Sequence, residues 1–315
     1  MNEHVSVLLD ECINALNIHE DGIYIDATLG RAGHSKAILA KLKKGHLYAF
    51  DKDQEAIDKC RHELQTSLDR VTLIHADFIH LKEELNKFGI QEVDGILFDL
   101  GVSSPQFDEA SRGFSYRFDA RLDMRMDQSQ ALDAYQVINQ YEESELRNIF
   151  WQYGEEHYAH KIAHRIVERR KIKPISTTFE LVKIIKECLP SYELRKKKHP
   201  AKQVFQAIRM AVNDELNHLA IALEEACDLL SVNGRLAIIS FHSIEDRVVK
   251  NILKKHCEQE RPDSRIAIKE SDIPQADFSL INKKPIVASD QELSRNRRSH
   301  SAKLRIIERR KKSNG

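Results

Sequence analysis

The sequence predicts an α/β fold, in which a parallel sheet covered by helices on both faces is interrupted by an inserted helical domain. Short apolar runs alternate with helical patterns through about the first hundred residues, and this alternation is typical of a parallel sheet. Helical patterns alone occupy about the next hundred residues. Strand character then returns at 235–241, which indicates that the sheet domain resumes after the insertion.

The first part of the sheet domain is expected to hold four strands with helices between them. Gly30 and Gly33 follow the first strand, and the helices are predicted from apolar residues at helical spacing, such as Ile38 and Leu42. The expected strands are 23–29, 46–51, 71–76 and 94–100, and the expected helices are 35–42, 54–64 and 81–88.

Within the insertion, Thr177 and Glu180 have the spacing of a capping box, for a helix that ends at Cys188. Pro200 stands where a first-turn proline begins a helix, and the apolar positions after it continue towards Leu230 as one helix. Two further helices are expected around 146–154 and 159–167.

The second part of the sheet domain is expected to follow the strand 235–241 with a helix capped by Ser243 together with Asp246. Strands at 278–281 and 303–307 complete it. The resulting division is a first sheet segment, an inserted mainly helical domain that recognises the substrate, and a second sheet segment with a basic tail; their ranges are 1–108, 109–215 and 216–315.

Charge is unevenly distributed along the 315 residues, although 49 Lys and Arg balance 49 Asp and Glu. The segment 283–315 holds eleven basic and three acidic residues, a net charge of +8, so the rest of the chain carries −8. Two more basic clusters lie at 169–173 and 195–199. Since few aromatic residues accompany these clusters, we expect contacts with phosphate rather than with bases.

Several classes of protein are disfavoured by composition. No apolar run has the roughly 18–20 residues that span a bilayer, and the acidic N-terminal stretch is unlike a signal peptide. We therefore expect a cytoplasmic protein without a membrane partner. The five cysteines are widely spaced, which argues against a disulfide framework or a zinc finger, and no metal site is predicted.

Acidic residues stand at the ends of the predicted strands, where open parallel sheets bind ligands. Asp26 precedes the glycine loop 30–34, whose backbone can approach a ligand closely. Asp51 is suited to accept the hydroxyls of a ribose, and Asp77 with Phe78 would lie beside an adenine. Asp99 ends the fourth strand, where a transferred group would lie.

This pattern leaves two cofactors open, a nicotinamide dinucleotide and S-adenosylmethionine. The dinucleotide fingerprint needs a glycine two residues before Gly30, and that position is Thr28. The loop is closer to the glycine loop of class I methyltransferases. The sequence therefore favours S-adenosylmethionine, with a nicotinamide-dependent oxidoreductase as an alternative.

Eight segments, spread in order over nearly the whole chain, resemble the RsmH (MraW) family of ribosomal RNA methyltransferases. The resemblance implies a class I (Rossmann-like) S-adenosylmethionine-dependent methyltransferase sheet with an inserted helical domain. It also implies methylation of the N4 amino group of a cytosine in the decoding region of 16S rRNA. The segments are Asp26–Ser35, Phe98–Gln106, Arg112–Ser115, Leu122–Asp127, His199–Arg209, Asn213–Leu216, Ile239–Arg247 and Arg298–Arg305.

The same resemblance implies the cofactor contacts. These are the loop residues Ala32, Gly33 and His34, the ribose acid Asp51, the adenine-side Phe78, and Asp99 with Gln106. The chain departs from the family at Ala32, where glycine is common, and at 119–122, where Gly-Pro is frequent. Alanine tolerates positive φ poorly, so a backbone contact from Ala32 requires a negative φ.

Exocyclic N4 is a poor nucleophile because its lone pair is delocalised into the ring, so an acceptor must orient it. Asp99, Ser103 and Ser104 are the catalytic candidates for that role. His242 is expected either to line the pocket or to form a structural hydrogen bond. No cysteine follows the strands, which disfavours a covalent route.

Basic residues within the family-like segments and the tail are the candidates for holding the rRNA backbone. The expected partner is 16S rRNA in the small ribosomal subunit, and a homodimer is left open. A non-catalytic RNA-binding or ribosome assembly factor is the other alternative, disfavoured by the intact Asp51 and glycine loop. The RNA-binding candidates are Lys202, Arg209, Arg297, Arg298 and Lys303.

Overall fold

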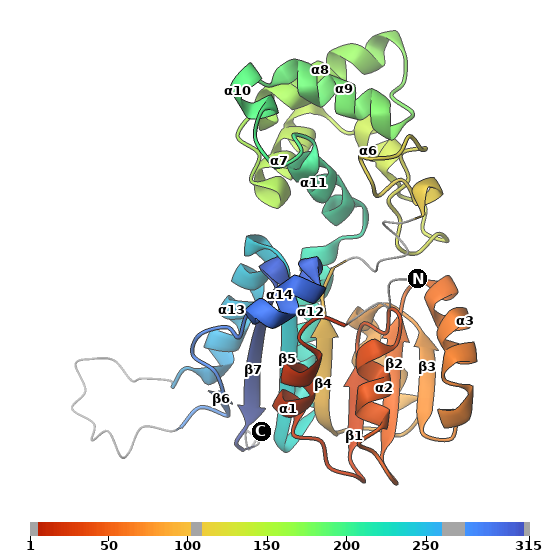
Figure 1. Cartoon of the computed structure of the whole chain (residues 1–315), viewed down its shortest axis with the longest axis vertical. Helices are drawn as coiled ribbons and strands as arrows, with labels where there is room; N and C mark the ends of the chain where they lie inside the picture. Colours follow the sequence, from red (N-terminus) through yellow and green to blue (C-terminus); the bar gives the residue numbers. More distant parts are fainter. Residues whose placement is uncertain (1–5, 102–108, 260–274, 312–315) are drawn as a thin grey trace, which may run out of the picture. The chain divides into compact units, whose positions relative to one another are not determined.

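The computed structural model describes residues 6–101, 109–259 and 275–311, and only the backbone of Arg297. They form two compact units: one comprises Met1–Gly101 and Leu216–Gly315, and the other comprises Val102–Glu215. Figure 1 shows the chain leaving the first unit after β4 and returning to it through α12. The division into 1–108, 109–215 and 216–315 stays a prediction.

The first unit is built on a seven-stranded sheet in the order β3-β2-β1-β4-β5-β7-β6. β3, β2, β1, β4 and β5 run parallel to one another, whereas β7 is antiparallel to both β5 and β6. The chain order reverses between β1 and β4, which is the switch point where such sheets bind ligands. The strands are β1 (Ile23–Asp26), β2 (His46–Asp51), β3 (Val71–His75), β4 (Val93–Asp99), β5 (Leu230–Ser240), β6 (Phe278–Leu280) and β7 (Lys303–Arg309).

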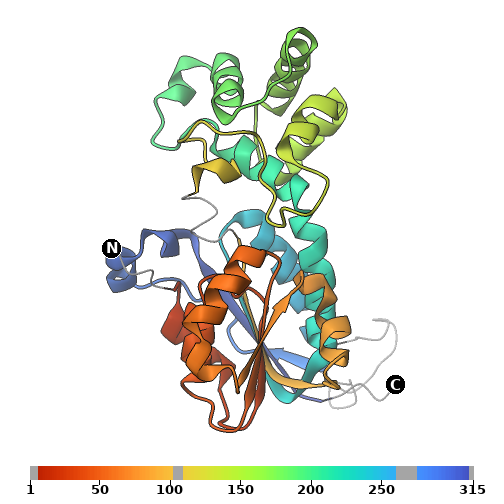
Figure 2. The ribbon, with the colours of Figure 1, turned by 90° about the vertical axis from the view of Figure 1, so that its right-hand side faces the viewer.

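Helices cover both faces of this sheet, as Figure 2 shows in an edge-on view. One face buries apolar side chains of α1 (Leu9–Leu16), α2 (Gly33–Leu39) and α3 (Gln54–Glu63). The other face buries those of α4 (Leu81–Asn86), α12 (Glu215–Leu229) and α13 (Ser243–Cys257). A short helix, α14 (Asp290–Arg295), precedes β7. The predicted fold class, an α/β sheet with an inserted helical domain, is confirmed.

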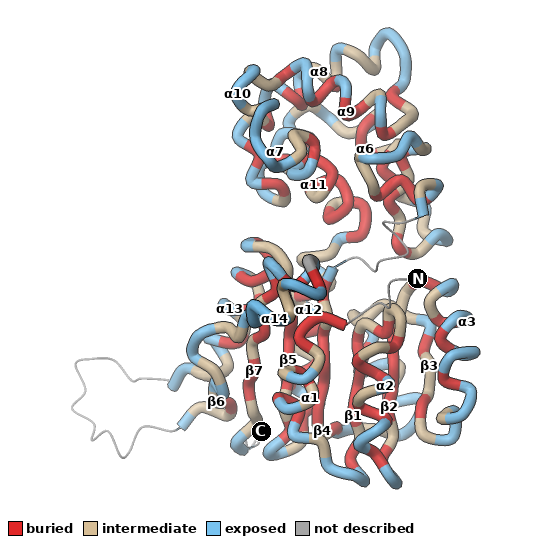
Figure 3. Tube along the Cα trace, viewed as in Figure 1, coloured by how far each residue is buried: buried red, intermediate tan, exposed pale blue. Residues whose placement is uncertain are grey.

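The inserted unit is helical and has a hydrophobic core of its own, formed by residues between Phe114 and Val212. Buried residues are concentrated in the strands of the sheet and along α11 in Figure 3. The capping box predicted at Thr177 and Glu180 is present at the start of α9. The helices of this unit are α6 (Ala134–Gln140), α7 (Glu143–Gly154), α8 (Ala159–Ile172), α9 (Thr178–Cys188), α10 (Ser191–Leu194) and α11 (Lys202–Val212).

Two local predictions were wrong. The single helix expected from Pro200 towards Leu230 is divided into α11 and α12, because Asp214 has a positive φ of 46° between them. The helix α13 is capped by His242, whose Nδ1 accepts the backbone N–H of Glu245 at 3.3 Å. Ser243 is therefore the first residue of that helix and not its cap.

Candidate functional site

The glycine loop follows β1 and begins with a turn that a glycine adopts without strain. Gly30 has a φ of +51°, and its N–H donates to Oδ2 of Asp51 at 2.9 Å. At Gly33 a Cβ atom would lie 1.9 Å from Oγ of Ser6, so only glycine allows the N-terminal segment to cross the loop this closely. The hydrogen bond from the Gly30 N–H to the Asp51 carboxylate thus holds the loop at the end of β2.

Ala32 departs from the geometry that a cofactor contact requires. Its φ is 56°, in the left-handed region, and its N–H donates to the carbonyl oxygen of Leu29 at 2.7 Å. The negative φ that a backbone contact from Ala32 would need is therefore absent, and the N–H already has a partner in the turn. Ala32 is fully buried at the start of α2, where it shapes the loop.

Asp51 ends β2 and holds two backbone N–H groups. Its Oδ2 accepts from Gly30 and its Oδ1 accepts from Asp53, both at 2.9 Å. Burial raises the pKa of Asp51 to about 6, although these two hydrogen bonds oppose the shift. Each carboxylate oxygen has a second lone pair, so the fixed carboxylate can still accept the two hydroxyls of a ribose.

Asp77 and Phe78 follow β3. The Phe78 ring packs edge-to-face on Phe98 at a centroid distance of 5.6 Å. Oδ2 of Asp77 lies 2.9 Å from Nδ1 of His218, and it accepts a hydrogen bond from Nζ of Lys52 at 3.3 Å. Burial opposes ionisation, but His218 and Lys52 lower the pKa of Asp77 to about 2. Asp77 is thus ionised and fixed in place beside Phe78. Sequence reasoning missed both of its partners, His218 and Lys52.

Asp99 ends β4, beside β1, at the switch point of the sheet. Oδ2 lies 3.6 Å from Nδ1 of the buried His34, and Oδ1 is buried with no hydrogen-bond partner among the described residues. Burial raises the pKa of Asp99 to about 6; His34 opposes this shift, whereas Asp26 and Glu245 add to it. An unpaired buried carboxylate oxygen is costly unless a ligand uses it, and this one is free to accept a hydrogen bond.

Val7 and Ser35, which sequence reasoning did not single out, fix the side chains of His34 and Asp26 around Asp99. Nε2 of His34 lies 3.0 Å from the carbonyl oxygen of Val7, and the fully buried Asp26 accepts a 2.6 Å hydrogen bond from Ser35. Burial raises the pKa of Asp26. The packing of α1 and α2 against the sheet brings these groups together, and no local spacing in the sequence signals it.

Three predicted site residues, Ser103, Ser104 and Gln106, lie outside the described residues. His242 takes the structural role: it caps α13, and its Nε2 lies 2.8 Å from Oε1 of Glu245. Among the residues that the structure describes, no group of three or more His, Cys, Asp or Glu side chains is arranged to hold a metal ion. None of the described helices has the length and apolar character to cross a membrane.

The RNA-binding candidates differ in how they are held. Arg209 does not fit the predicted phosphate contact, because it is buried and binds both carboxylate oxygens of Glu215 at 2.7 Å. Lys303 contacts Asp246 at 3.0 Å, beside Arg305. Lys202 and Arg298 are exposed. Arg297 belongs to a short 3-10 turn, Arg297–Ser301.

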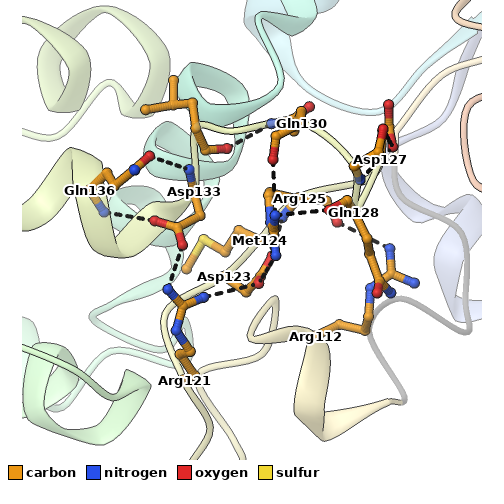
Figure 4. Close-up of polar contacts among 12 residues, drawn as sticks. Arg112, Arg121, Asp123, Met124, Arg125, Asp127, Gln128, Gln130, Asp133 and Gln136 are labelled. Atoms are coloured by element: carbon orange, nitrogen blue, oxygen red, sulfur yellow. Dashed lines mark hydrogen bonds and ion pairs between the residues drawn. The ribbon is translucent and has the colours of Figure 1, made fainter.

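Charged residues brace the loop between the start of the inserted unit and α6, as Figure 4 shows. The Arg121 guanidinium contacts Asp123 at 3.2 Å and Asp133 at 2.6 Å. Arg125 donates to both carboxylate oxygens of Asp123, from Nε to Oδ1 at 2.9 Å and from Nη2 to Oδ2 at 2.8 Å. Backbone and side-chain contacts therefore fix the segment 119–122 without the Gly-Pro that is frequent in the family.

The glycine loop, the acids of β2 and β4 and the reversal of the sheet define the class of protein, an enzyme of the class I methyltransferase type. The donor set fits an adenosine-bearing ligand: Asp51 suits a ribose, Phe78 an adenine, and the unpaired Oδ1 of Asp99 the reacting group. The chain belongs to the MraW methylase family, whose model matches residues 1–310. It is accordingly a methyltransferase that uses S-adenosylmethionine, and the oxidoreductase alternative is excluded.

Curated relatives match the chain over almost its whole length. It is 52% identical over 311 residues to ribosomal RNA small subunit methyltransferase H of Lactobacillus delbrueckii subsp. bulgaricus, covering 97% of this chain and 98% of that protein. It is 53% identical to the protein of the same name from Exiguobacterium sibiricum, covering 99% and 100%. Among solved structures, an rRNA methylase from Streptococcus thermophilus has a TM-score of 0.42 and 15% identity, over 96% of this chain and 94% of that one.

Proposed function

We propose that this protein methylates 16S rRNA in the small ribosomal subunit, at the N4 amino group of a cytosine in the decoding region. Its membership of the MraW methylase family supports a methyl transfer, and the name of its relatives supports the rRNA substrate. The observation that carries the amino target is the free Oδ1 of Asp99 at the end of β4.

The proposed mechanism assigns one task to each fixed side chain. Asp51 accepts the ribose hydroxyls of S-adenosylmethionine, and Phe78 contacts its adenine. When bound, this cofactor supplies an electrophilic methyl group. Asp99 accepts an N–H of the cytosine amine at Oδ1, which orients the amine and draws electron density back to N4. The proton that N4 loses then passes to Oδ1.

The basic candidates supply the RNA contacts in this proposal. A stacked or paired cytosine must be turned out of its helix to reach a buried carboxylate, which costs a few kcal/mol. Phosphate contacts by Lys202 and by Arg297, Arg298 and Lys303 of the C-terminal segment would offset that cost. A homodimer stays a prediction, as does the cytoplasmic location.

The test is to incubate the protein and S-adenosylmethionine with 16S rRNA and, separately, with small ribosomal subunits from cells that lack the enzyme. Mass spectrometry of the digested RNA should detect N4-methylcytidine at one position. A methyl group on carbon 5 or on a ribose would contradict the proposed chemistry. RNA bound without any methylation would support the alternative of an assembly factor.

A further inference from the structure

One region of the inserted unit carries exposed positive charge that no carboxylate among the described residues neutralises. It surrounds His199 and comprises Arg117, Lys186, Arg195, Lys197 and Lys198, here called the His199 surface. Arg117 and Lys186 lie close enough to act on the His199 ring electrostatically. The other three, Arg195, Lys197 and Lys198, stand within the four residues before His199 in the chain. None of the five cations forms an ion pair with another described residue.

A second basic region of the same unit serves as a contrast. Arg165 and Arg169 both contact Glu187, at 3.3 Å and 2.7 Å, and Lys173 contacts Glu180 at 2.8 Å. Acids thus neutralise much of the charge of this region, which includes the cluster 169–173. Two acids close in sequence to these cations have other partners: Glu193 binds Lys196 at 2.7 Å, and Asp119 accepts the N–H of Phe179 at 3.2 Å.

His199 is fixed with one N–H available to a ligand. Its ring stacks on Tyr116 at a centroid distance of 4.3 Å and an angle of 7°. Nδ1 accepts the N–H of Ala201 at 3.2 Å, so the neutral ring carries its proton on Nε2. Burial, Lys186 and Arg117 lower the pKa of His199, which favours the neutral ring. Nε2 has no partner among the described residues.

We propose that the His199 surface binds the phosphate backbone of the RNA substrate, with the neutral Nε2–H of His199 as a hydrogen-bond donor among five unpaired cations. Exposed cations without acidic partners are what a polyanion recognises, because each phosphate contact releases a condensed counterion. The stacked Tyr116 holds the ring in place before the RNA arrives. Lys202 extends the surface, since its N–H donates to the carbonyl oxygen of His199 at 3.0 Å. The proposal rests on the proposed function, in that it takes rRNA as the substrate.

The experiment compares two triple variants of the full chain. Arg117→Gln, Lys186→Gln and Lys197→Gln remove three cations of the His199 surface, and Arg165→Gln, Arg169→Gln and Lys173→Gln remove three neutralised cations of the same unit. Binding to a 16S rRNA transcript is measured by filter retention over a range of KCl concentrations. The first variant should bind about tenfold more weakly or worse, and its salt slope should fall by about two to three. The second variant should stay near the wild type.

His199→Phe adds a variant that keeps an aromatic ring beside Tyr116 but removes the N–H. It should bind the transcript more weakly with an unchanged salt slope, because no charge is lost. Circular dichroism and S-adenosylmethionine affinity, both expected to be unchanged, control for folding.

Equal losses in the two triple variants, or none in either, would overturn the assignment of this surface. So would a loss confined to assembled subunits, which would indicate a ribosomal protein as the partner. A wild-type protein that binds the transcript but methylates no rRNA would contradict the proposed function and leave the binding result to decide the surface by itself.

Discussion

Nδ1 of His34 lies 3.6 Å from Oδ2 of Asp99, while Nε2 of the same ring lies 3.0 Å from the carbonyl oxygen of Val7. Because a carbonyl oxygen only accepts, Nε2 carries a proton in every state of the ring. Nδ1 is therefore the ring nitrogen that faces Asp99, and the contact with Val7 fixes the ring in that orientation.

The first prediction concerns the pH dependence of methyl transfer. Asp99 must be ionised to accept an N–H at Oδ1, and its pKa is raised to about 6. The single-turnover rate at saturating cofactor should therefore rise as pH increases through about 6 and then level off. Asp99→Asn should lower the plateau by roughly a hundredfold and abolish this step. A variant with the wild-type rate and profile would remove Asp99 from the chemistry.

The second prediction concerns cofactor binding by Asp51. Replacing Asp51 with Ala removes a charged acceptor, which should weaken S-adenosylmethionine binding by roughly 1.5–3 kcal/mol. The pKa of about 6 adds a signature: as pH falls from 7.5 to 5, wild-type affinity should fall by about tenfold, and the variant should lack this step. Isothermal calorimetry measures both, with circular dichroism as the control for folding. An unchanged dissociation constant would contradict the ribose assignment.

The third prediction separates Arg209 from Lys202, which lie on the same helix. Arg209→Ala leaves the largely covered Glu215 side chain, 11% exposed, without its partner, which should destabilise the inserted unit by about 3–5 kcal/mol. Lys202→Ala removes an exposed side chain and should change stability by less than about 0.5 kcal/mol, while weakening RNA binding. The only tryptophan of the chain, Trp151, lies in α7 of this unit, so its fluorescence in urea follows the unfolding. Equal stability losses would refute the assignment.

The fourth prediction tests the C-terminal segment. Replacing Arg297, Arg298 and Lys303 with Gln should weaken rRNA binding and flatten its salt dependence, with S-adenosylmethionine affinity unchanged. Arg305 still holds Asp246 when Lys303 is replaced, at 2.7 Å, so β7 should stay in place. Replacing the exposed Arg310 and Lys311 instead provides a comparison from the opposite end of β7. If the first variant kept the wild-type affinity and salt slope, these three residues would not hold the RNA.

Local sequence signals predicted the sheet well. The strand His46–Asp51 has the predicted bounds, because the apolar run there ends at an acid, Asp51, which is the last residue of the strand. The order of the acids along the strand ends likewise follows from the chain alone, since the carboxyl ends of parallel strands meet at one edge.

What the sequence did not reveal depends on contacts between distant segments. The apolar spacing continues from Val212 to Leu219, yet the helix ends at Val212. The Asn213 side chain bonds the backbone of Met124 and Met126 at 2.8 Å, and Asp214 takes a positive φ. His218 reaches Asp77 across 141 residues of chain. The partner of Arg209 is near in sequence, but only its burial shows that the pair is structural.

The discontinuous path of the sheet constrains how the protein is made. β4 ends at Asp99, and its neighbour β5 begins only at Leu230. At translation rates of about 5–20 residues per second, the ribosome takes on the order of ten seconds to synthesise the stretch between them. The nascent chain therefore carries a half-built sheet, with one edge of β4 open, while the inserted unit already has all the residues of its own core. Unpaired strand edges can pair with other chains. We therefore expect slower synthesis of β5 to increase the fraction of nascent chains that aggregate.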